Sequence, residues 1–285
     1  MPFERVRADA LTFDPTARES PHSLLVNRMS PSAGTRGHAH AVFQTLHYLT
    51  HLQRLGAPVL NGRAAYEVEL SKAAQAALAA ELGLAYPRTR VVSSAGDAVR
   101  AAEELAFPVL VKPNIGGSGA GIRSFETIDE LRGSAEELEL GLDGTALVQE
   151  QLPAEGDAVV RIEILDGEFL YAIRLRLLPG SFNLCPADYC DLPGVADGVS
   201  GRGLPVERFD PPPEVIEDAK RLVAAAGMDL GGVEYLVDAR TGTPTFYDVN
   251  ALSNFVADAP NVIGFDPFLN LVDLILERAG ALVSA

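Results

Sequence analysis

Apolar residues along the chain follow helical spacing in some stretches and strand spacing in others, which indicates a protein with both helices and sheets. Apolar residues three or four positions apart predict helices at 38–55, 67–82, 95–105, 124–140, 213–226 and 266–279. Short apolar runs bounded by turn residues predict strands at 23–28, 58–62, 88–92, 107–112 and 146–151. No period of about 20–50 residues repeats, so a solenoid is excluded.

The second half of the chain is expected to form antiparallel hairpins. Strands at 158–165 and 168–178 are joined by Asp166-Gly167, a pair that is typical of two-residue hairpin turns. Strands at 232–238 and 245–250 are joined by a second turn at 239–243. The segment 178–213 is rich in proline and glycine, which predicts a long loop. The predicted fold class is therefore α+β, without a doubly wound parallel sheet.

Length, composition and charge identify a globular protein and exclude several other classes. The chain has 285 residues, 47% of them hydrophobic and 22% charged, enough for one large domain or two or three lobes. No apolar run reaches the roughly 18 residues of a membrane helix, and the charged N-terminus is unlike a secretory signal. A membrane is therefore not an expected partner. A net charge of -16 repels polyphosphate backbones, so nucleic acid is not an expected partner either.

The basic residues are almost all arginine. Only Lys72, Lys112 and Lys220 are lysines among the 23 basic residues. In such a chain, lysine is expected to remain where a compact ammonium group on a flexible side chain has to reach a negative charge. Chance alone would also explain the small number of lysines.

A glycine-rich segment at 114–121 follows Lys112 and the predicted strand 107–112. Glycine backbones approach phosphate groups closely and offer N–H donors, and a lysine at the strand end adds a positive charge. No Gly-Lys-Ser/Thr sequence closes the segment, so it is not a Walker loop. Taken alone, the segment is equally consistent with a hairpin turn.

Two carboxylates and an amide are expected to share one face of the last hairpin. Asp248 and Asn250 are two residues apart on one strand, and Glu234 lies near the paired position on the other strand. Such oxygen ligands suit Mg2+ that is also held by phosphate, although solvated surface carboxylates would show the same pattern.

Taken together, these motifs stand in an order that resembles the ATP-grasp superfamily, most closely its ribosomal-protein glutamate ligase, or RimK-like, branch. The resemblance covers about residues 22–278. It implies two α+β subdomains that clasp ATP, preceded by a short N-terminal lobe. The domain boundaries that we expect are a reduced N-terminal lobe at 1–65 and an ATP-grasp domain at 66–285, divided into a lid at about 87–148 and a C-terminal subdomain at about 149–285.

The resemblance also implies roles for individual residues. Lys72 and Lys112 match the lysines that contact the α- and β-phosphates of ATP, and 114–121 matches the mobile loop that covers them. The nucleotide-binding set is expected to include Gly116, Gly117, Ser118, the adenine hinge Glu150, Gln151 and Leu152, and Asp157 at the ribose. Glu234, Asp248 and Asn250 match the ligands of Mg2+, with Mn2+ as an alternative. Arg176 resembles the arginine beside the γ-phosphate and the acyl phosphate, and Asn183 a polar partner near it.

The sequence departs from the family pattern at three points. Asp248 stands where the family usually has glutamate, and no proline closely follows Asn250. Only about 60 residues precede Asn61, fewer than the first lobe of the family usually has. The first two departures concern the metal geometry, and the third concerns the extent of the first lobe.

The activity that the resemblance implies is ATP- and Mg2+-dependent ligation of a carboxylate to an amine through an acyl phosphate. A kinase on the same fold and a non-catalytic ATP-binding module are the alternatives. The expected partners are a small-molecule or peptide carboxylate and an amine or amino acid, and homo-oligomers are left open. The expected location is the cytoplasm, since Cys185 and Cys190 form no disulfide framework.

Three further features have no assigned role. His40, His47 and His51 share a helical face and are either surface or substrate-facing residues, or part of a zinc site. Cys185 and Cys190 are either plain thiols or a redox pair. A polar segment is either a solvated loop or a contact for an acidic substrate, and it contains Arg28, Ser30, Ser32 and Arg36.

Overall fold

The computed structural model describes residues 3–117, 119–177, 206–256 and 258–283. Within these ranges the strands form three sheets. A two-stranded parallel sheet belongs to the N-terminal lobe, and a four-stranded antiparallel sheet belongs to the middle of the chain. A five-stranded antiparallel sheet belongs to the C-terminal part. The predicted α+β class is confirmed.

The N-terminal lobe is built on two short strands and one long helix. Strand β1 (Leu25–Val26) pairs with β2 (Val59–Leu60), and α1 (Ala39–Arg54) connects them. The helix buries an apolar face whose residues pack against the following helix and the glycine-rich segment. The predictions of strands at 23–28 and 58–62 and of a helix at 38–55 are confirmed.

The single helix expected at 67–82 is wrong, because the chain forms α2 (Arg63–Leu70) and α3 (Lys72–Glu81) instead. Ser71 between them has extended φ and ψ angles, and its hydroxyl accepts a hydrogen bond from the N–H of Ala74 at 3.1 Å. Serine is a favoured helix cap because it satisfies such a free N–H group. The break makes Lys72 the first residue of α3.

The four-stranded sheet has the order β3 (Thr89–Val92), β6 (Ala146–Glu150), β4 (Val109–Pro113), β5 (Arg123–Phe125). Helices α4 (Ala95–Ala102) and α5 (Ile128–Gly133) cover its apolar face.

The helix predicted at 124–140 is wrong over most of its length. Phe125 is buried in β5 opposite Val109, and the Thr127 hydroxyl accepts from the Glu130 N–H, so the helix α5 starts only after the strand. A 3-10 turn at Ala135–Glu137 follows, and the remaining apolar residues pack in an extended segment.

The five-stranded sheet has the order β11 (Thr243–Asn250), β10 (Leu230–Asp238), β7 (Ala158–Leu165), β8 (Glu168–Arg176), β9 (Val206–Arg208). Asp166 and Gly167 both have positive φ angles, 50° and 77°, as the Asp-Gly turn predicts. Strand β9 falls in the stretch that was expected to be loop. Residues 178–205 of that stretch lie outside the described ranges.

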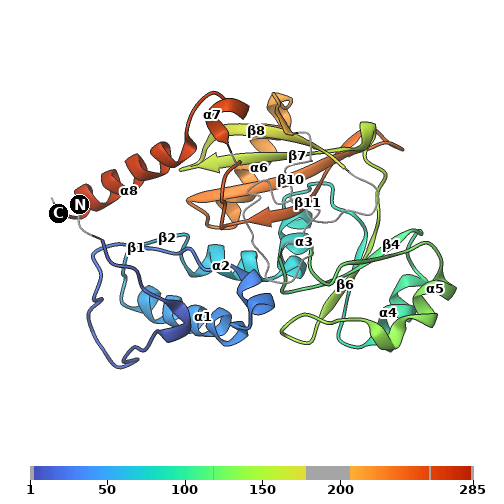
Figure 1. Ribbon diagram of the computed structural model, residues 1–285, viewed down its shortest axis with the longest axis horizontal. Coiled ribbons are helices and arrows are strands. Elements are labelled where there is room, and N and C mark those ends of the chain that lie inside the picture. The colour runs from blue at the N-terminus through green and yellow to red at the C-terminus, as the bar shows by residue number, and fades with distance from the viewer. Residues whose placement is uncertain (1–2, 118, 178–205, 257, 284–285) are drawn as a thin grey trace.

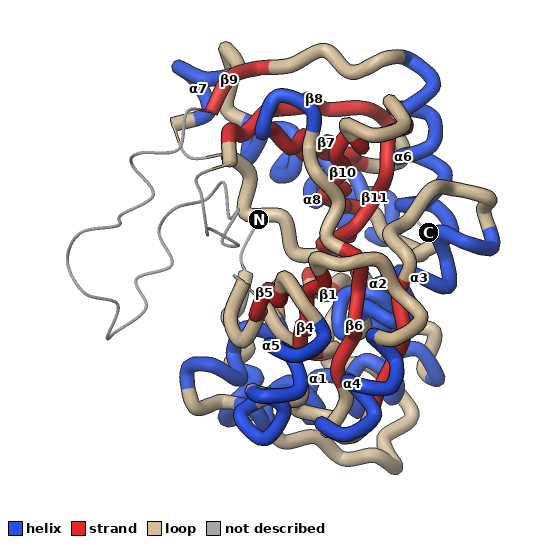
Figure 2. The backbone as a smooth tube through the Cα atoms, turned by 90° about the vertical axis from the view of Figure 1, so that its right-hand side faces the viewer, coloured by secondary structure: helices blue, strands red, loops and turns tan. Residues whose placement is uncertain are grey.

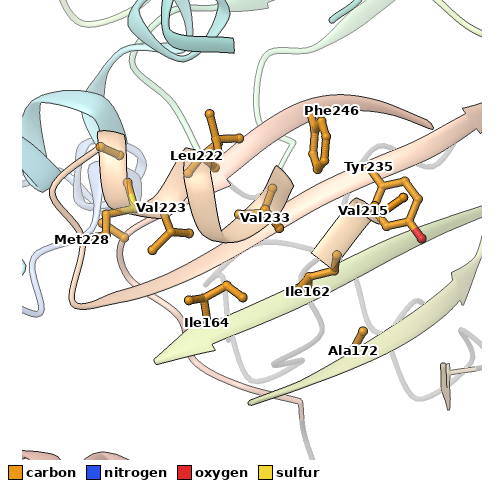
Figure 3. Close-up of a cluster of buried hydrophobic side chains, with 14 of the residues drawn as sticks. Ile162, Ile164, Ala172, Val215, Leu222, Val223, Met228, Val233, Tyr235 and Phe246 are labelled. Carbon is orange, nitrogen blue, oxygen red and sulfur yellow. The ribbon is translucent and has the colours of Figure 1, made fainter. Parts of the chain in front are cut away.

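Helices cover both faces of the five-stranded sheet. On one face, α6 (Pro213–Ala225) packs Val215, Leu222 and Val223 against strand residues that include Ile162 and Tyr235 (Figure 3). On the other face, α7 (Ala259–Val262) and α8 (Pro267–Val283) pack against Tyr171, Ile173 and their neighbours. The final helix confirms the prediction at 266–279, whereas α7 is not visible in the sequence pattern.

The three parts of the chain meet around α3. Figure 1 shows the five-stranded sheet above, the lobe with α1 and α2 at the lower left, and the four-stranded sheet with α4 and α5 at the lower right. Figure 2, turned by 90°, again shows the five-stranded sheet above the four-stranded one. None of the described helices has the length and hydrophobicity that crossing a membrane requires.

Candidate active site

The two predicted carboxylates lie side by side on the last hairpin. Glu234 of β10 is the register partner of Asp248 of β11, and Asn250 is the partner of Gly232. Because side chains alternate along a strand, Glu234, Asp248 and Asn250 share one face of the sheet. This is the face opposite to the Val233 and Val249 core that α6 covers.

Lys72 joins this group from the start of α3. Its Nζ donates to Asp248 Oδ1 at 2.7 Å, and both side chains are largely buried. Burial alone would lower the pKa of Lys72, but the Asp248 charge and hydrogen bond raise it above its usual range. Burial would likewise raise the pKa of Asp248, but Lys72 holds it below its usual value. The pair is therefore fully charged at neutral pH.

Lys112 approaches the same group from the four-stranded sheet. The side chain is buried on β4, and no described carboxylate forms an ion pair with it. Burial lowers the pKa of Lys112 to about 7, the charge of Lys72 acts in the same direction, and the charges of Asp248 and Glu234 oppose these two effects. A buried lysine without a close counter-charge is a strong attractor for an anion such as phosphate.

We expect ATP affinity to fall as the pH rises above about 7, because Lys112 then loses its proton in the free protein. Bound phosphate favours the ammonium form, so nucleotide binding at about pH 8 should take up a proton. Calorimetry in two buffers with different ionisation enthalpies measures this uptake directly. Lys112→Ala should remove the uptake and weaken Mg-ATP binding by about 1.5–3 kcal/mol. Unchanged affinity in this variant would rule out contact between Lys112 and the phosphates.

Arg161 of β7 lies at the centre of the same face and was missed by the sequence analysis. Its side chain is buried, and it donates to Glu163 at 2.6 Å, to Glu234 at 2.8 Å and to the Ser253 hydroxyl at 3.3 Å. The guanidinium lies over Gly232, where an added Cβ would come within 2.3 Å of Nη2. The available signal was a pair of charges, at 161 and 163, inside an otherwise apolar strand.

The donor set of Glu234, Asp248 and Asn250 fits a hard divalent cation. Burial and the neighbouring Asp248 charge raise the pKa of Glu234, while Arg161 opposes this rise, so the two carboxylates repel each other in the absence of a cation. The described residues offer no group of three His, Cys, Asp or Glu side chains for a metal, so further ligands have to come from water and phosphate. That requirement matches Mg2+, which usually keeps several waters and binds phosphate oxygens.

The predicted adenine hinge lies at the end of β6. The N–H groups of Glu150 and Gln151 donate to the carbonyl oxygens of Arg88 and Pro108, both at 2.9 Å. The buried Glu150 carboxylate accepts from the Ala106 N–H at 2.9 Å, so its role here is structural. No hydrogen bond from the Leu152 N–H to another described residue is present, which leaves this group for a ligand.

Asp157 lies at the start of β7, in a 3-10 turn after the hinge. Its side chain is exposed, and its main-chain oxygen accepts from the Leu177 N–H at 2.7 Å. This hydrogen bond fixes the start of β7. The Asp157 carboxylate remains accessible, which a contact with ribose hydroxyls requires.

The glycine-rich segment packs against the N-terminal lobe. A Cβ at Gly117 would come within 3.1 Å of the Ser32 Cβ, whereas Gly116 has more room. The Asn114 side chain accepts from the Ala73 N–H at 3.0 Å, which ties the segment to the first turn of α3. Ser118 lies outside the described residues.

The structure does not group Arg176 with the carboxylates. Arg176 pairs with Ala158 at the end of β8 and alternates with Leu175, so it lies on the face that α6 covers and is exposed there. Arg174, on the same face, stacks on the Phe209 ring. Asn183, Cys185 and Cys190 lie outside the described residues.

The histidines make aromatic contacts within the first lobe. His51 stacks on Phe13 with ring centroids 5.2 Å apart, and His22 meets Tyr48 edge-on at 6.4 Å. His38 and His40 contact each other at 6.2 Å. The described residues bring no three possible metal-ligating side chains together in this lobe.

Comparisons relate this chain to a known ATP-binding domain and to known ligases. The family model for the carbamoyl-phosphate synthase L chain, ATP binding domain matches residues 70–151. D-alanine–D-alanine ligase A of Bradyrhizobium diazoefficiens is 29% identical over 209 residues, which cover 68% of this chain and 52% of that protein. The chain spans 23% to 52% of the length of the first curated relatives that it matches.

Solved structures share the fold over most of the chain. D-cycloserine synthetase DcsG superposes with a TM-score of 0.63 and 20% identity, covering 93% of this chain and 87% of that one. A RimK domain ATP-grasp protein from Sphaerobacter thermophilus superposes with a TM-score of 0.60 and 17% identity, covering 96% and 85%. The chain therefore has the ATP-grasp fold, and its residues 70–151 match the family model of an ATP-binding domain.

Proposed function

We propose that the protein is an ATP- and Mg2+-dependent ligase that joins a carboxylate to an amine through an acyl phosphate. The observation that carries this proposal is the meeting of Lys72, Lys112 and Arg161 with Glu234 and Asp248 between the two larger sheets. Phosphoryl transfer needs this combination of cations and metal-binding carboxylates, because negative charge builds up on the transferred group. A ligase and a synthetase among the similar proteins support the same reaction class.

Each side chain has a distinct task in this proposal. Lys112 and Lys72 would neutralise the phosphates, and Glu234, Asp248 and Asn250 would hold Mg2+, which would supply Lewis-acid stabilisation of the charge on the phosphate oxygens. The Leu152 N–H binds the adenine edge, and Asp157 binds the ribose hydroxyls.

Two arginines are candidates for the developing acyl phosphate. Arg161 lies beside Glu234 and retains N–H groups beyond its three hydrogen bonds. Arg176 is the candidate from the family resemblance and is exposed at the end of β8. A cytoplasmic location, where ATP and Mg2+ are abundant, is part of the proposal.

Hydroxylamine trapping tests the proposal. Acyl phosphates react with hydroxylamine to give hydroxamates, whereas phosphate esters do not. With a carboxylic acid, ATP and Mg2+, the protein should form a hydroxamate together with ADP. A stable phosphorylated product without hydroxamate would show a kinase, and nucleotide binding without turnover for any acid would show a binding module.

The same assay separates the two arginines. We expect the variant that removes the acyl-phosphate contact to keep ATP affinity but lose hydroxamate formation by at least ~100-fold, since a donor used only in the transition state affects kcat. Arg161→Lys and Arg176→Ala are compared for this loss, with ATP affinity measured by calorimetry. Loss in Arg161→Lys alone would exclude Arg176 as the contact, and full hydroxamate formation in both variants would contradict the assignment to an arginine.

A further inference from the structure

A cationic segment of the N-terminal lobe borders the candidate active site and has no role in the proposed phosphoryl transfer. It runs from Arg28, just after β1, to Arg36 at the end of the 3-10 helix Pro31–Arg36. One end contacts the loop that follows β11, and the middle packs against Gly117 of the glycine-rich segment. The segment therefore lies along the edge of the site.

Arg28 is anchored to neutral acceptors. Its Nη1 donates to the Ser253 carbonyl at 2.8 Å and its Nη2 to Asn254 Oδ1 at 2.9 Å. The Asn27 side chain accepts from the Met29 N–H at 3.1 Å, which fixes the backbone around Arg28. A guanidinium has five N–H groups, so these contacts hold Arg28 in place and leave donors for a ligand.

No described carboxylate pairs with Arg28, although two acidic side chains interact with it at longer range. Burial lowers the pKa of Arg28, and Glu163 and Glu69 oppose this effect. Neither carboxylate forms an ion pair with Arg28: one oxygen of Glu163 accepts from Arg161 at 2.6 Å, and Glu69 accepts from the N–H groups of the loop after β11. Among the described residues, the positive charge of Arg28 thus has neutral hydrogen-bond acceptors but no carboxylate in direct contact.

Arg36 repeats this arrangement closer to the glycine-rich segment. Its Nη1 donates to the Ser32 hydroxyl at 2.9 Å, and Ser32 shares a 2.7 Å hydrogen bond with Ser30. Like Arg28, Arg36 has no described carboxylate partner. In a chain with a net charge of -16, two arginines on this segment that pair with no described carboxylate add local positive charge beside the site, which attracts anions.

Ser253 separates this patch from the metal face. Arg161 binds the Ser253 hydroxyl from the metal side, whereas Arg28 binds the Ser253 carbonyl from the side of the N-terminal lobe. A carboxylate that reacts beside Glu234 and Asp248 would therefore not be the group that Arg28 binds. A second anionic group, a few carbon atoms away in the same molecule, would reach it.

We propose that Arg28 and Arg36 bind a second anionic group of the acid substrate, so that the preferred substrates are dianionic acids carrying a further carboxylate or phosphate. This inference rests on the proposed ligase function and adds the substrate class. Charge-assisted hydrogen bonds of arginine to carboxylate or phosphate supply both affinity and geometry.

The first experiment compares acids of equal chain length. Glutarate and pentanoate differ only in the second carboxylate, and 4-phosphonobutyrate carries a phosphonate in its place. Hydroxamate formation with ATP, Mg2+ and hydroxylamine is measured for each acid. We expect the KM of glutarate or 4-phosphonobutyrate to be at least ~10-fold below that of pentanoate, as one charge-assisted hydrogen bond provides. Whichever of the two has the lower KM shows whether the second anionic group is a carboxylate or a phosphate.

Variants then locate the contact. Arg28→Gln and Arg36→Gln should each raise the KM of the dianionic acid ~10-fold and leave the KM of ATP and of pentanoate unchanged. Arg28→Lys keeps the charge and should retain most of the preference, and Arg54→Gln, an exposed arginine on α1 without a described carboxylate partner, is the matched control. Calorimetry of dianionic acids with the Mg2+ complex of a non-hydrolysable ATP analogue gives a readout without turnover.

The results distinguish this inference from the proposed function. Equal KM values for glutarate, 4-phosphonobutyrate and pentanoate, or variants that weaken pentanoate and dianions alike, would overturn the role of Arg28 and Arg36 while the ligase stands. Dianions that bind in an Arg28-dependent manner but never give a hydroxamate would overturn the ligase and keep the anion site. Failure of any dianion to bind or react would overturn the inference.

Discussion

Asp248→Asn should abolish Mg2+-dependent ADP formation, with a loss of at least ~100-fold, because even residues that only support metal ligands cost 10–100-fold when removed. The substitution keeps the shape of the side chain and removes one of the two charges that would hold the cation. Coupled measurement of ADP release over a range of Mg2+ concentrations gives the result. Full turnover at limiting Mg2+ would place the cation away from Asp248.

The same substitution should also destabilise the protein. Asp248 is the ion-pair partner of Lys72, and the two side chains are only 21% and 15% exposed. Removing one member of a buried pair leaves the other charge without compensation, which costs about 3 kcal/mol. We expect denaturant unfolding to report this loss.

A second variant separates the two effects. Lys72→Met combined with Asp248→Asn removes both charges, so stability should recover while ADP formation stays lost. Asp129→Asn, which breaks an exposed pair with Arg132, is the control and should change neither property. If the double variant regained turnover, the Asp248 carboxylate would have no role beyond pairing with Lys72.

Local patterns in the sequence predict the architecture because each strand and helix carries its own signal. The Asp166-Gly167 turn, the glycine-rich segment after Lys112 and the i, i+2 pair of Asp248 and Asn250 are readable within a few residues. The break at Ser71 is harder to predict, because the residues before it and the alanine-rich stretch after it both favour a helix.

The remaining site residues depend on contacts between distant segments. Arg161 matters because Gly232 leaves room for its guanidinium and Glu234 accepts from it, and both depend on the register of β7 and β10. The sequence shows the charge inside the strand but not the partner. The face on which Arg176 lies follows from the same register, so a family resemblance alone does not determine it.

Gly232→Ala should remove most of the activity, because the position tolerates no side chain while Arg161 is in place. An ideal Cβ would lie 2.3 Å from Arg161 Nη2 and 2.7 Å from Cζ. Arg161 is held by Glu163, Glu234 and Ser253, so it cannot move aside without breaking buried hydrogen bonds. We expect a stability loss of about 3 kcal/mol from overpacking and the disrupted ion pair.

The loss of activity should exceed the loss of folded protein. With Arg161 displaced, the Glu234 carboxylate loses its orientation, so kcat per folded molecule should fall roughly 10–100-fold, as for groups that support metal ligands. Gly231→Ala provides the matched control, since its Cβ would point to the opposite face, 2.8 Å from a Val223 methyl group. That variant should lose stability but keep kcat at a temperature where it is folded. Equal kcat per folded molecule in both glycine variants would show that Arg161 serves packing alone.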